Sequence, residues 1–173
     1  MRILVTGGVR SGKSRHAEGL LAARERVRYV APGAVPSADD PEWAVRVAAH
    51  QARRPAHWET VETRDLPGAI ALGGATLVDC LGTWLTATLD DVGAWTADGD
   101  RWSGDLERRV DAVVAAVAAA DDVVLVTNEV GLGVVPAHAS GRLFRDLLGT
   151  LNQRVAAVCD EVHLVVAGRV LRL

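Results

Sequence analysis

The hydrophobic positions of this chain fall into short apolar runs that alternate with longer segments of helical periodicity. The short runs are typical of buried strands, and they predict strands over residues 3–6, 27–31, 58–62, 75–80, 123–127 and 161–166. Apolar positions that recur every three or four residues predict helices over residues 13–24, 41–53, 83–89, 105–120 and 140–158. Gly168 follows the last strand and predicts a terminal hairpin.

This alternation of strands and helices predicts the fold class. Parallel strands need crossover connections, and a parallel sheet is covered by helices on both faces. We therefore expect one α/β domain over residues 1–173, with a mostly parallel sheet and a C-terminal hairpin. Two segments without periodicity, 32–40 and 90–103, are expected to be irregular. Ligands of such sheets bind at the carboxyl ends of the strands, so functional residues are expected there.

Composition narrows the class of protein without indicating a reaction. Hydrophobic residues make up 49% of the chain and charged residues 24%, as in an ordinary globular domain, and the net charge of −3 does not favour nucleic-acid binding. The apolar stretches are too short for a membrane span and the N-terminus lacks a secretory signal pattern, so we expect a cytoplasmic location. Cys80 and Cys159 lack metal-ligand spacing and lie in or beside apolar runs, which favours core thiols.

A phosphate-binding motif lies between the first predicted strand and the first predicted helix. The stretch VTGGVRSGKSRHAE contains the pattern G-x-x-x-x-G-K-S from Gly7 to Ser14. In this context the backbone N–H groups of the loop converge on phosphate oxygens, Lys13 reaches the β- and γ-phosphates, and Ser14 holds Mg²⁺. Lys13 is also the chain's single lysine among 19 basic residues. A chain that otherwise uses arginine suggests that a compact ammonium is needed here.

Acidic and amide side chains follow two later strands. Asp79 ends an apolar run in the manner of a Walker B acid, and it either holds Mg²⁺ or starts the next turn. Asn128 and Glu129 follow the strand over 123–127. Glu129 either orients a water or an acceptor hydroxyl, or it belongs with Asn128 to a turn or a helix cap.

A histidine with two arginines marks the second predicted helix. In RVAAHQARRPAHWETVE, residues 46–62, His50 precedes Arg53 and Arg54 by three and four positions, which places them on neighbouring helix surface. Two guanidinium groups nearby disfavour an imidazolium and could hold a triphosphate for attack by the neutral ring. The alternative is a surface histidine with solvated arginines beside it. His57, beside a proline and a tryptophan, is expected to be a packing residue.

At these residues the chain resembles the bifunctional adenosylcobinamide kinase / adenosylcobinamide-phosphate guanylyltransferase (CobU/CobP) family of cobalamin biosynthesis. The phosphate loop is shared by many ATPases, but TNEVGLGVVP and LNQRVAA…DEVHLVVAG are more specific, and the matching stretches cover nearly the whole chain. They are VTGGVRSGKSRHAE, RRPAHWETVE, VTNEVGLGVVP and RDLLGTLNQRVAAVCDEVHLVVAGR.

The resemblance implies two reactions, a RecA-like P-loop fold and a homotrimer. A nucleoside triphosphate, ATP or GTP, phosphorylates adenosylcobinamide. GTP then gives GMP to adenosylcobinamide-phosphate through a covalent histidine, which matches His50, with release of pyrophosphate. Lys13 matches the catalytic lysine of the loop, and Ser14 and Asp79 match the Mg²⁺ ligands. The nucleotide-binding positions match Gly7, Gly8, Val9, Arg10, Ser11, Gly12, Lys13, Ser14, Ala31, Pro32, Gly33, Gln51, Ala52, Arg53, Arg54, Glu62 and Asp79.

The chain departs from the family pattern at two places. Pro32 and Gly33 stand where the family commonly has Thr-Ser, so hydroxyl contacts to the nucleotide are lost there. Asp79 stands where family members often carry Glu, and it reaches about one methylene less far.

Two other functions fit the phosphate loop alone. A monofunctional P-loop kinase would use Lys13, Ser14 and Asp79 without any need of His50, and a regulatory NTP-binding module would bind nucleotide without modifying itself. The tryptophans Trp84, Trp95 and Trp102 leave a separate choice open. They either pack in the protein interior or cover a subunit interface or the corrin ring.

Overall fold

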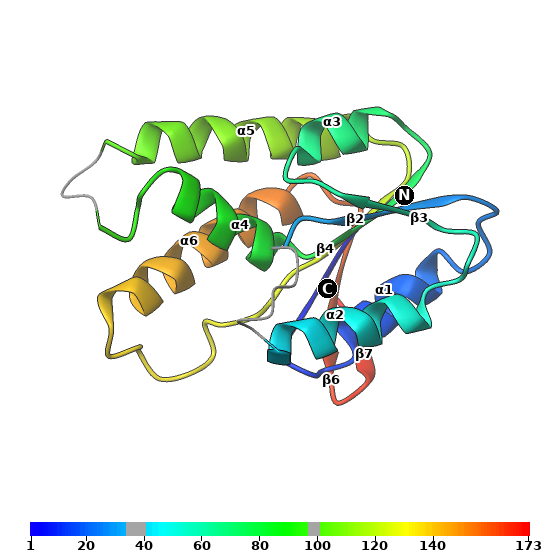
Figure 1. Cartoon of the computed structure of the whole chain (residues 1–173), viewed down its shortest axis with the longest axis horizontal. Helices are drawn as coiled ribbons and strands as arrows, with labels where there is room; N and C mark the ends of the chain where they lie inside the picture. Colours follow the sequence, from blue (N-terminus) through cyan, green and yellow to red (C-terminus); the bar gives the residue numbers. More distant parts are fainter. Residues whose placement is uncertain (34–40, 97–100) are drawn as a thin grey trace.

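Seven strands form one sheet in the computed structural model, which describes residues 1–33, 41–96 and 101–173 (Figure 1). The strand order is β3-β2-β4-β5-β1-β6-β7. The first six strands pair in parallel, and β7 pairs antiparallel to β6 as the predicted terminal hairpin. This is the predicted α/β architecture, a mostly parallel sheet that ends in a hairpin. The strands are β1 Arg2–Gly7, β2 Val27–Ala31, β3 Glu59–Glu62, β4 Ala75–Asp79, β5 Val123–Val126, β6 Glu161–Val166 and β7 Arg169–Arg172.

Helices cover both faces of the sheet. Figure 1 shows α1 and α2 together on one side and α3, α4, α5 and α6 on the other. Over the described residues, no helix is long and apolar enough to cross a membrane. The helices are α1 Lys13–Leu20, α2 Pro41–Arg53, α3 Leu66–Ala71, α4 Leu81–Asp91, α5 Ser103–Ala119 and α6 Ala139–Ala156.

The central strands are apolar throughout because both of their faces are buried. In β5, Val124 and Val126 pack in the core beneath α1, whereas Val123 and Leu125 pack in the larger core beneath α4, α5 and α6. All four side chains are fully buried. The sequence of such a strand is a continuous hydrophobic run rather than an alternating pattern. The apolar runs therefore predicted the positions of these strands.

Helix α1 is shorter than predicted, and helix α3 was not predicted at all. Helix α1 ends at Leu20 rather than at residue 24, because the chain tightens into short turns in which Leu21 N–H donates to Glu18 O and Arg24 N–H donates to Leu21 O. Helix α3 was not predicted, since its six residues are too few to show a period. It is started by Asp65, whose carboxylate accepts a hydrogen bond of 3.0 Å from the backbone of Gly68.

The three tryptophans take part in tertiary packing. Trp84 is 3% exposed, and its indole N–H donates to the carbonyl of Arg64 at 3.0 Å. Trp95 and Trp102 are partly buried against the same core. The irregular segment over 90–103 is shorter than expected at both ends, since α4 continues to Asp91 and α5 begins at Ser103, and residues 97–100 lie outside the described part.

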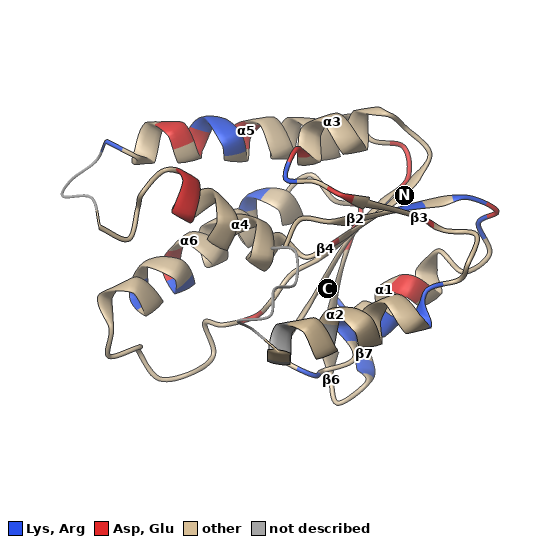
Figure 2. Ribbon diagram, in the orientation of Figure 1, with Lys and Arg blue, Asp and Glu red and all other residues tan. Residues whose placement is uncertain are grey.

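The remaining side-chain predictions concern thiols and charge. Cys80 and Cys159 are partly buried, and burial raises the pKa of both, that of Cys159 to about 11, which fits unreactive core thiols. Figure 2 shows acidic and basic side chains interspersed along α5, where Glu107 and Asp111 both pair with Arg154 of α6. Charges of both signs are therefore paired across α5 and α6.

Candidate active site

The predicted functional segments converge at the carboxyl edge of the sheet. Val126 of β5 lies opposite Val5 of β1 on one side and opposite Asp79 of β4 on the other, so β1, β4 and β5 end at the same level. The segment after β5 stays bound to this edge, because Glu129 N–H donates to Gly7 O at 3.1 Å. The carboxylate of Glu129 accepts from Gly131 N–H at 2.8 Å, which is the predicted turn arrangement.

The phosphate loop makes a close approach to β6 at its first glycine. A Cβ atom on Gly7 would lie 2.4 Å from the carbonyl oxygen of Val165 and 2.7 Å from Ser11 Oγ. The far side of the loop is also fixed, since Gly168 N–H in the β6–β7 turn donates to Ser11 O at 2.8 Å. Helix α1 begins directly after Gly12, whose φ of 97° is left-handed. The loop therefore has the strand-to-helix setting that phosphate binding requires.

Lys13 is held within this loop. Its side chain is 9% exposed, and Nζ donates to the carbonyl of Gly8 at 3.1 Å. An ammonium in this position is partly desolvated and already oriented, so its attraction for a phosphate is stronger than it would be in water.

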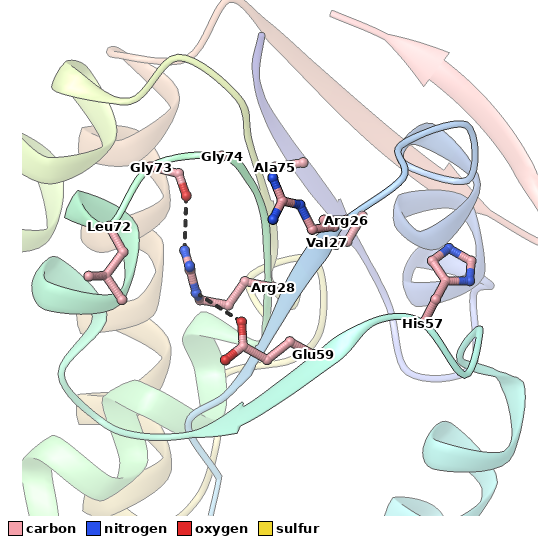
Figure 3. A pocket seen from close by; sticks show the side chains of 9 residues that line it. All are labelled: Arg26, Val27, Arg28, His57, Glu59, Leu72, Gly73, Gly74 and Ala75. Atoms are coloured by element: carbon pink, nitrogen blue, oxygen red, sulfur yellow. Dashed lines mark hydrogen bonds and ion pairs between the residues drawn. The ribbon is translucent and has the colours of Figure 1, made fainter.

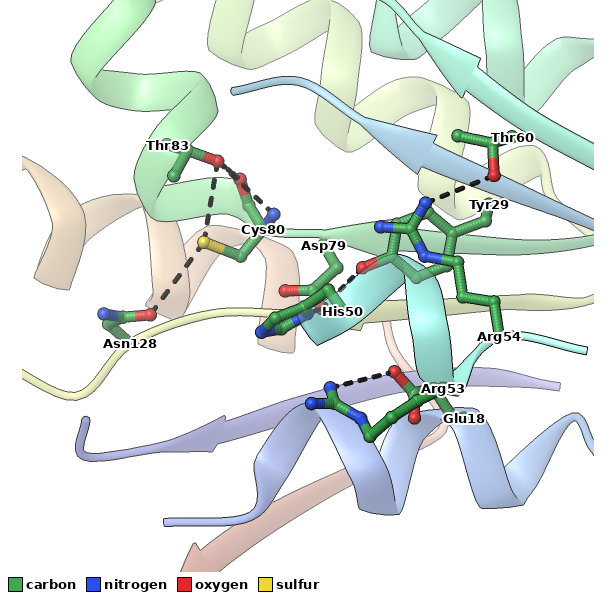
Figure 4. Close-up of polar contacts among 10 residues, drawn as sticks. All are labelled: Glu18, Tyr29, His50, Arg53, Arg54, Thr60, Asp79, Cys80, Thr83 and Asn128. Carbon is green, nitrogen blue, oxygen red and sulfur yellow. Dashed lines mark hydrogen bonds and ion pairs between the residues drawn. The ribbon is translucent and has the colours of Figure 1, made fainter. Parts of the chain in front are cut away.

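Asp79 is the centre of a group of polar contacts at the end of β4 (Figure 4). Its side chain is 9% exposed, and Oδ2 accepts from the hydroxyl of Tyr29 at 2.8 Å and lies 3.5 Å from Nδ1 of His50. Burial by itself raises the pKa of Asp79, but hydrogen bonds with His50, Tyr29 and Ser14 outweigh burial and hold the pKa below its usual range. The carboxylate is therefore ionised at neutral pH.

Ser14 and Asp79, the two predicted Mg²⁺ ligands, are in contact. A hydroxyl and a carboxylate are the oxygen donors that Mg²⁺ prefers, and this ion is usually held by one or two protein groups together with water and substrate phosphates. No group of three or more His, Cys, Asp and Glu suited to a metal occurs among the described residues. The Ser14 hydroxyl and the Asp79 carboxylate together fit a Mg²⁺ ion that binds with a nucleotide.

Helix α2 brings His50 to Asp79 but directs the two arginines elsewhere. Arg53 donates to Glu18 of α1 at 3.3 Å. The guanidinium of Arg54 lies 3.4 Å from the centre of the Tyr29 ring and donates to Thr60 at 3.2 Å. Both guanidinium groups are thus bound by other side chains in this structure, and His50 faces the carboxylate of Asp79.

The other predicted nucleotide positions lie along the same edge or on its exposed rim. Ala31 and Glu62 are opposite one another at the ends of β2 and β3, and Pro32 and Gly33 follow Ala31. Val9 and Arg10 of the loop and Gln51 and Ala52 of α2 are exposed.

The packing role predicted for His57 is wrong. His57 is exposed, and the neighbouring Trp58 is the buried side chain at 7% exposure. His57 lines a cavity of about 430 Å³ at the amino ends of β2, β3 and β4, the edge opposite the phosphate loop (Figure 3). Arg28, which also lines this cavity, is bound to the carbonyl of Gly73 at 2.9 Å and lies 3.7 Å from Glu59.

Three side chains that support the site were not predicted. Tyr29 holds Asp79, as described above. Thr127, fully buried at the end of β5, donates to Asn152 Oδ1 at 2.7 Å, and Asn152 Nδ2 donates to the carbonyl of Asn128 at 3.1 Å. Asn152 thereby ties α6 to the end of β5. Asn152 belongs to the LNQRVAA stretch that carries the family resemblance, but the sequence did not indicate a role for this residue.

Replacing Asn152 with alanine is expected to lower the free energy of unfolding by about 1–3 kcal/mol, because the buried Thr127 hydroxyl and the Asn128 carbonyl both lose their partner. Urea unfolding measures this change. Gln153→Ala is the matched control, since Gln153 is the exposed neighbour on the same helix. Equal unfolding midpoints for the two variants would contradict the role given to Asn152.

Comparison with known proteins gives a family and several close relatives. The family model described as cobinamide kinase / cobinamide phosphate guanyltransferase matches residues 3–173. The "bifunctional adenosylcobalamin biosynthesis protein CobU" of Salmonella typhimurium is 44% identical and that of Escherichia coli 41%, each over 97% of both chains. The corresponding CobP of Pseudomonas aeruginosa is 40% identical over 97% of this chain and 94% of its own.

Among solved structures, P4 protein from bacteriophage phi6 in complex with ADP aligns with 98% of this chain and 54% of its own. The identity is 17% and the TM-score 0.42.

Proposed function

The chain belongs to the cobinamide kinase / cobinamide phosphate guanyltransferase family, and on this premise we propose that both reactions take place around Lys13, His50 and Asp79. In the kinase reaction a nucleoside triphosphate, ATP or GTP, phosphorylates adenosylcobinamide. In the transferase reaction GTP gives GMP to adenosylcobinamide-phosphate, which yields adenosylcobinamide-GDP and pyrophosphate. The observation that carries the proposal is the position of His50 against Asp79, which itself contacts Ser14 of the phosphate loop.

Guanylyl transfer proceeds in two displacements. His50 attacks the α-phosphorus of GTP, and the backbone N–H groups of the loop and the Lys13 ammonium stabilise the departing pyrophosphate. The phosphate of the cobinamide substrate then displaces GMP from His50. Ser14 and Asp79 would hold a Mg²⁺ ion, which would neutralise further phosphate charge. Arg53 and Arg54 help to hold the triphosphate if their side chains exchange Glu18 and Tyr29 for phosphate oxygens.

The kinase reaction uses the same loop without His50. Lys13 stabilises the charge that develops on the γ-phosphoryl group while the substrate hydroxyl attacks in line. A loose transition state of this kind needs little help from a general base. Asp79 and Glu129 are the carboxylates at this edge that could accept the proton, and the ionised state of Asp79 and the turn hydrogen bond of Glu129 are compatible with that role.

We also propose that residues 1–173 form one domain that assembles as a homotrimer, as the family resemblance implies. The segment after β5 supports an assembly of some kind, because it exposes Leu132 at 86%, Val134 at 95% and Val135 at 61%. Exposed apolar side chains that lie this close together are typical of a surface that binds a partner or a large apolar substrate.

Covalent labelling tests the transferase assignment. The protein is incubated with Mg²⁺ and GTP labelled at the α-phosphate and is then denatured. We expect label that survives alkali, is lost in acid and is absent from His50→Ala, because a phosphoramidate has this stability. His57→Ala is the matched control and should keep full labelling, since His57 lies at the opposite edge of the sheet.

The same samples separate the alternatives. His50→Ala should still phosphorylate adenosylcobinamide, because the kinase reaction does not use the imidazole. Phosphorylation by the wild type without any label would identify a monofunctional kinase, and nucleotide binding without either activity would identify a regulatory module.

A further inference from the structure

We propose that Tyr29 is a positioning residue, which fixes Asp79 against Nδ1 of His50 so that Nε2 is the nitrogen that receives GMP. The inference rests on the proposed guanylylation of His50 and adds to it the reacting atom and the residue that selects this atom.

Tyr29 is itself rigidly placed. It lies in the middle of β2, is 1% exposed and packs in the core beneath α1. The guanidinium of Arg54 covers its ring at 3.4 Å and is in turn bound to Thr60 of the neighbouring strand β3 at 3.2 Å. A tyrosine hydroxyl carries its proton at neutral pH, and here it has a carboxylate oxygen to donate to at 2.8 Å. Tyr29 is thus a permanent donor with a fixed direction.

The hydroxyl of Tyr29 fixes the oxygen that faces His50. It donates to Oδ2 of Asp79 at 2.8 Å, and the same Oδ2 lies 3.5 Å from Nδ1 of His50 (Figure 4). This second distance is longer than an ordinary hydrogen bond, as is common for catalytic pairs before substrate binds. Because Tyr29 occupies one lone-pair direction of Oδ2, the carboxylate cannot rotate away without breaking a buried hydrogen bond.

An ionised carboxylate selects the tautomer of the imidazole that faces it. The carboxylate only accepts hydrogen bonds, so the nitrogen beside it carries the proton. That nitrogen is Nδ1, and the lone pair of the neutral ring therefore lies on Nε2. Nε2 lies across the ring from Nδ1 and is therefore turned away from Asp79, and the side chain of His50 is 31% exposed.

The two displacements balance with this assignment. The Nε2 lone pair forms the bond to the α-phosphorus while the bond from phosphorus to the bridging oxygen breaks, and its electron pair leaves with pyrophosphate. Nδ1 keeps its proton, so the guanylylated ring is cationic and Asp79 compensates its charge. An oxygen of the acceptor phosphate then bonds to phosphorus, and the electron pair of the phosphorus–nitrogen bond returns to Nε2. No proton has to leave or reach His50, and the cationic guanylylated ring releases a neutral imidazole, which is a good leaving group.

NMR of the guanylylated protein tests the assignment. Protein labelled uniformly with ¹⁵N is incubated with Mg²⁺ and GTP, and ³¹P–¹⁵N coupling with long-range ¹H–¹⁵N correlations shows which nitrogen carries phosphorus. We expect a single species with GMP on Nε2 of His50. In Tyr29→Phe we expect labelling that is about tenfold slower, as for loss of a hydrogen bond to a charged group, together with a detectable fraction of the Nδ1 isomer.

His57→Ala is the control, because His57 lines the cavity at the opposite edge of the sheet and its loss leaves the Tyr29 hydroxyl on Asp79. It should label at the wild-type rate and on Nε2 alone, so a change of isomer is specific to the hydroxyl of Tyr29. GMP on Nδ1 of the wild type would overturn the inference and leave the transferase assignment intact. No GMP on His50 would overturn the proposed function itself. A Tyr29→Phe protein with the wild-type rate and only the Nε2 isomer would remove Tyr29 from the mechanism.

Discussion

Replacing Lys13 with methionine is expected to lower both the phosphorylation of adenosylcobinamide and the guanylylation of His50 by about a hundredfold to a thousandfold. The ammonium of Lys13 is 9% exposed and is held by Gly8 O at 3.1 Å, so it meets the phosphates without first being reoriented. Methionine keeps the volume of the side chain and removes its charge, so the fold should persist. Rates of product formation and of covalent labelling measure the two losses separately.

Arg15→Met is the matched control for this change, because Arg15 is an exposed cation on the same helix. It should retain both activities. The pattern across variants is also informative, since His50→Ala should lose one reaction and Lys13→Met both. If Lys13→Met kept either rate within tenfold of the wild type, the lysine would not be a shared catalytic group.

Replacing Gly7 with alanine is expected to destabilise the protein by about 1–3 kcal/mol and to weaken GTP binding more than tenfold. The added methyl carbon would lie 2.4 Å from the backbone oxygen of Val165, which a side-chain rotation cannot relieve. Val165 cannot yield easily either, because β6 pairs in register with β1 at this position. The loop must therefore move away from the sheet edge, and its backbone N–H groups then no longer point at one phosphate.

Gly8→Ala gives the matched control for the Gly7 variant. A Cβ on Gly8 meets no atom within 4 Å, so this neighbouring substitution tests the cost of a methyl group in the loop without a clash. Urea unfolding and equilibrium dialysis of GTP compare the two variants. Equal stability and affinity would show that β6 does not limit the position of the loop.

Much of the fold could be predicted because its signals are local. Strands β2 and β6 have the limits that their apolar runs predict. Helix α2 likewise begins at Pro41, as a proline in the first turn predicts. Helix α3 gave no comparable signal, because it is one and a half turns long and owes its position to packing beneath α5.

The reactive residues could be predicted singly, but their contacts could not. Lys13 and Asp79 belong to recognisable motifs at strand ends. Helical spacing predicted that His50, Arg53 and Arg54 share one region of a helix surface. It could not indicate that the two arginine side chains would contact Glu18 and Tyr29. These partners come from α1 and β2, and only the packing of α2 on the sheet brings them within reach. The bond between Tyr29 and Asp79 is of the same kind, since it joins positions 50 residues apart.

The solitary lysine also has a use in chemical labelling. Amine-directed reagents meet one lysine side chain in this sequence, that of Lys13. Acylation of Lys13 reports whether the phosphate loop is open, because the residue is 9% exposed and a bound triphosphate covers it further. The yield of this adduct in a peptide mass spectrum, relative to an unmodified peptide of the same digest, therefore measures nucleotide occupancy with no engineered probe and no radiolabel.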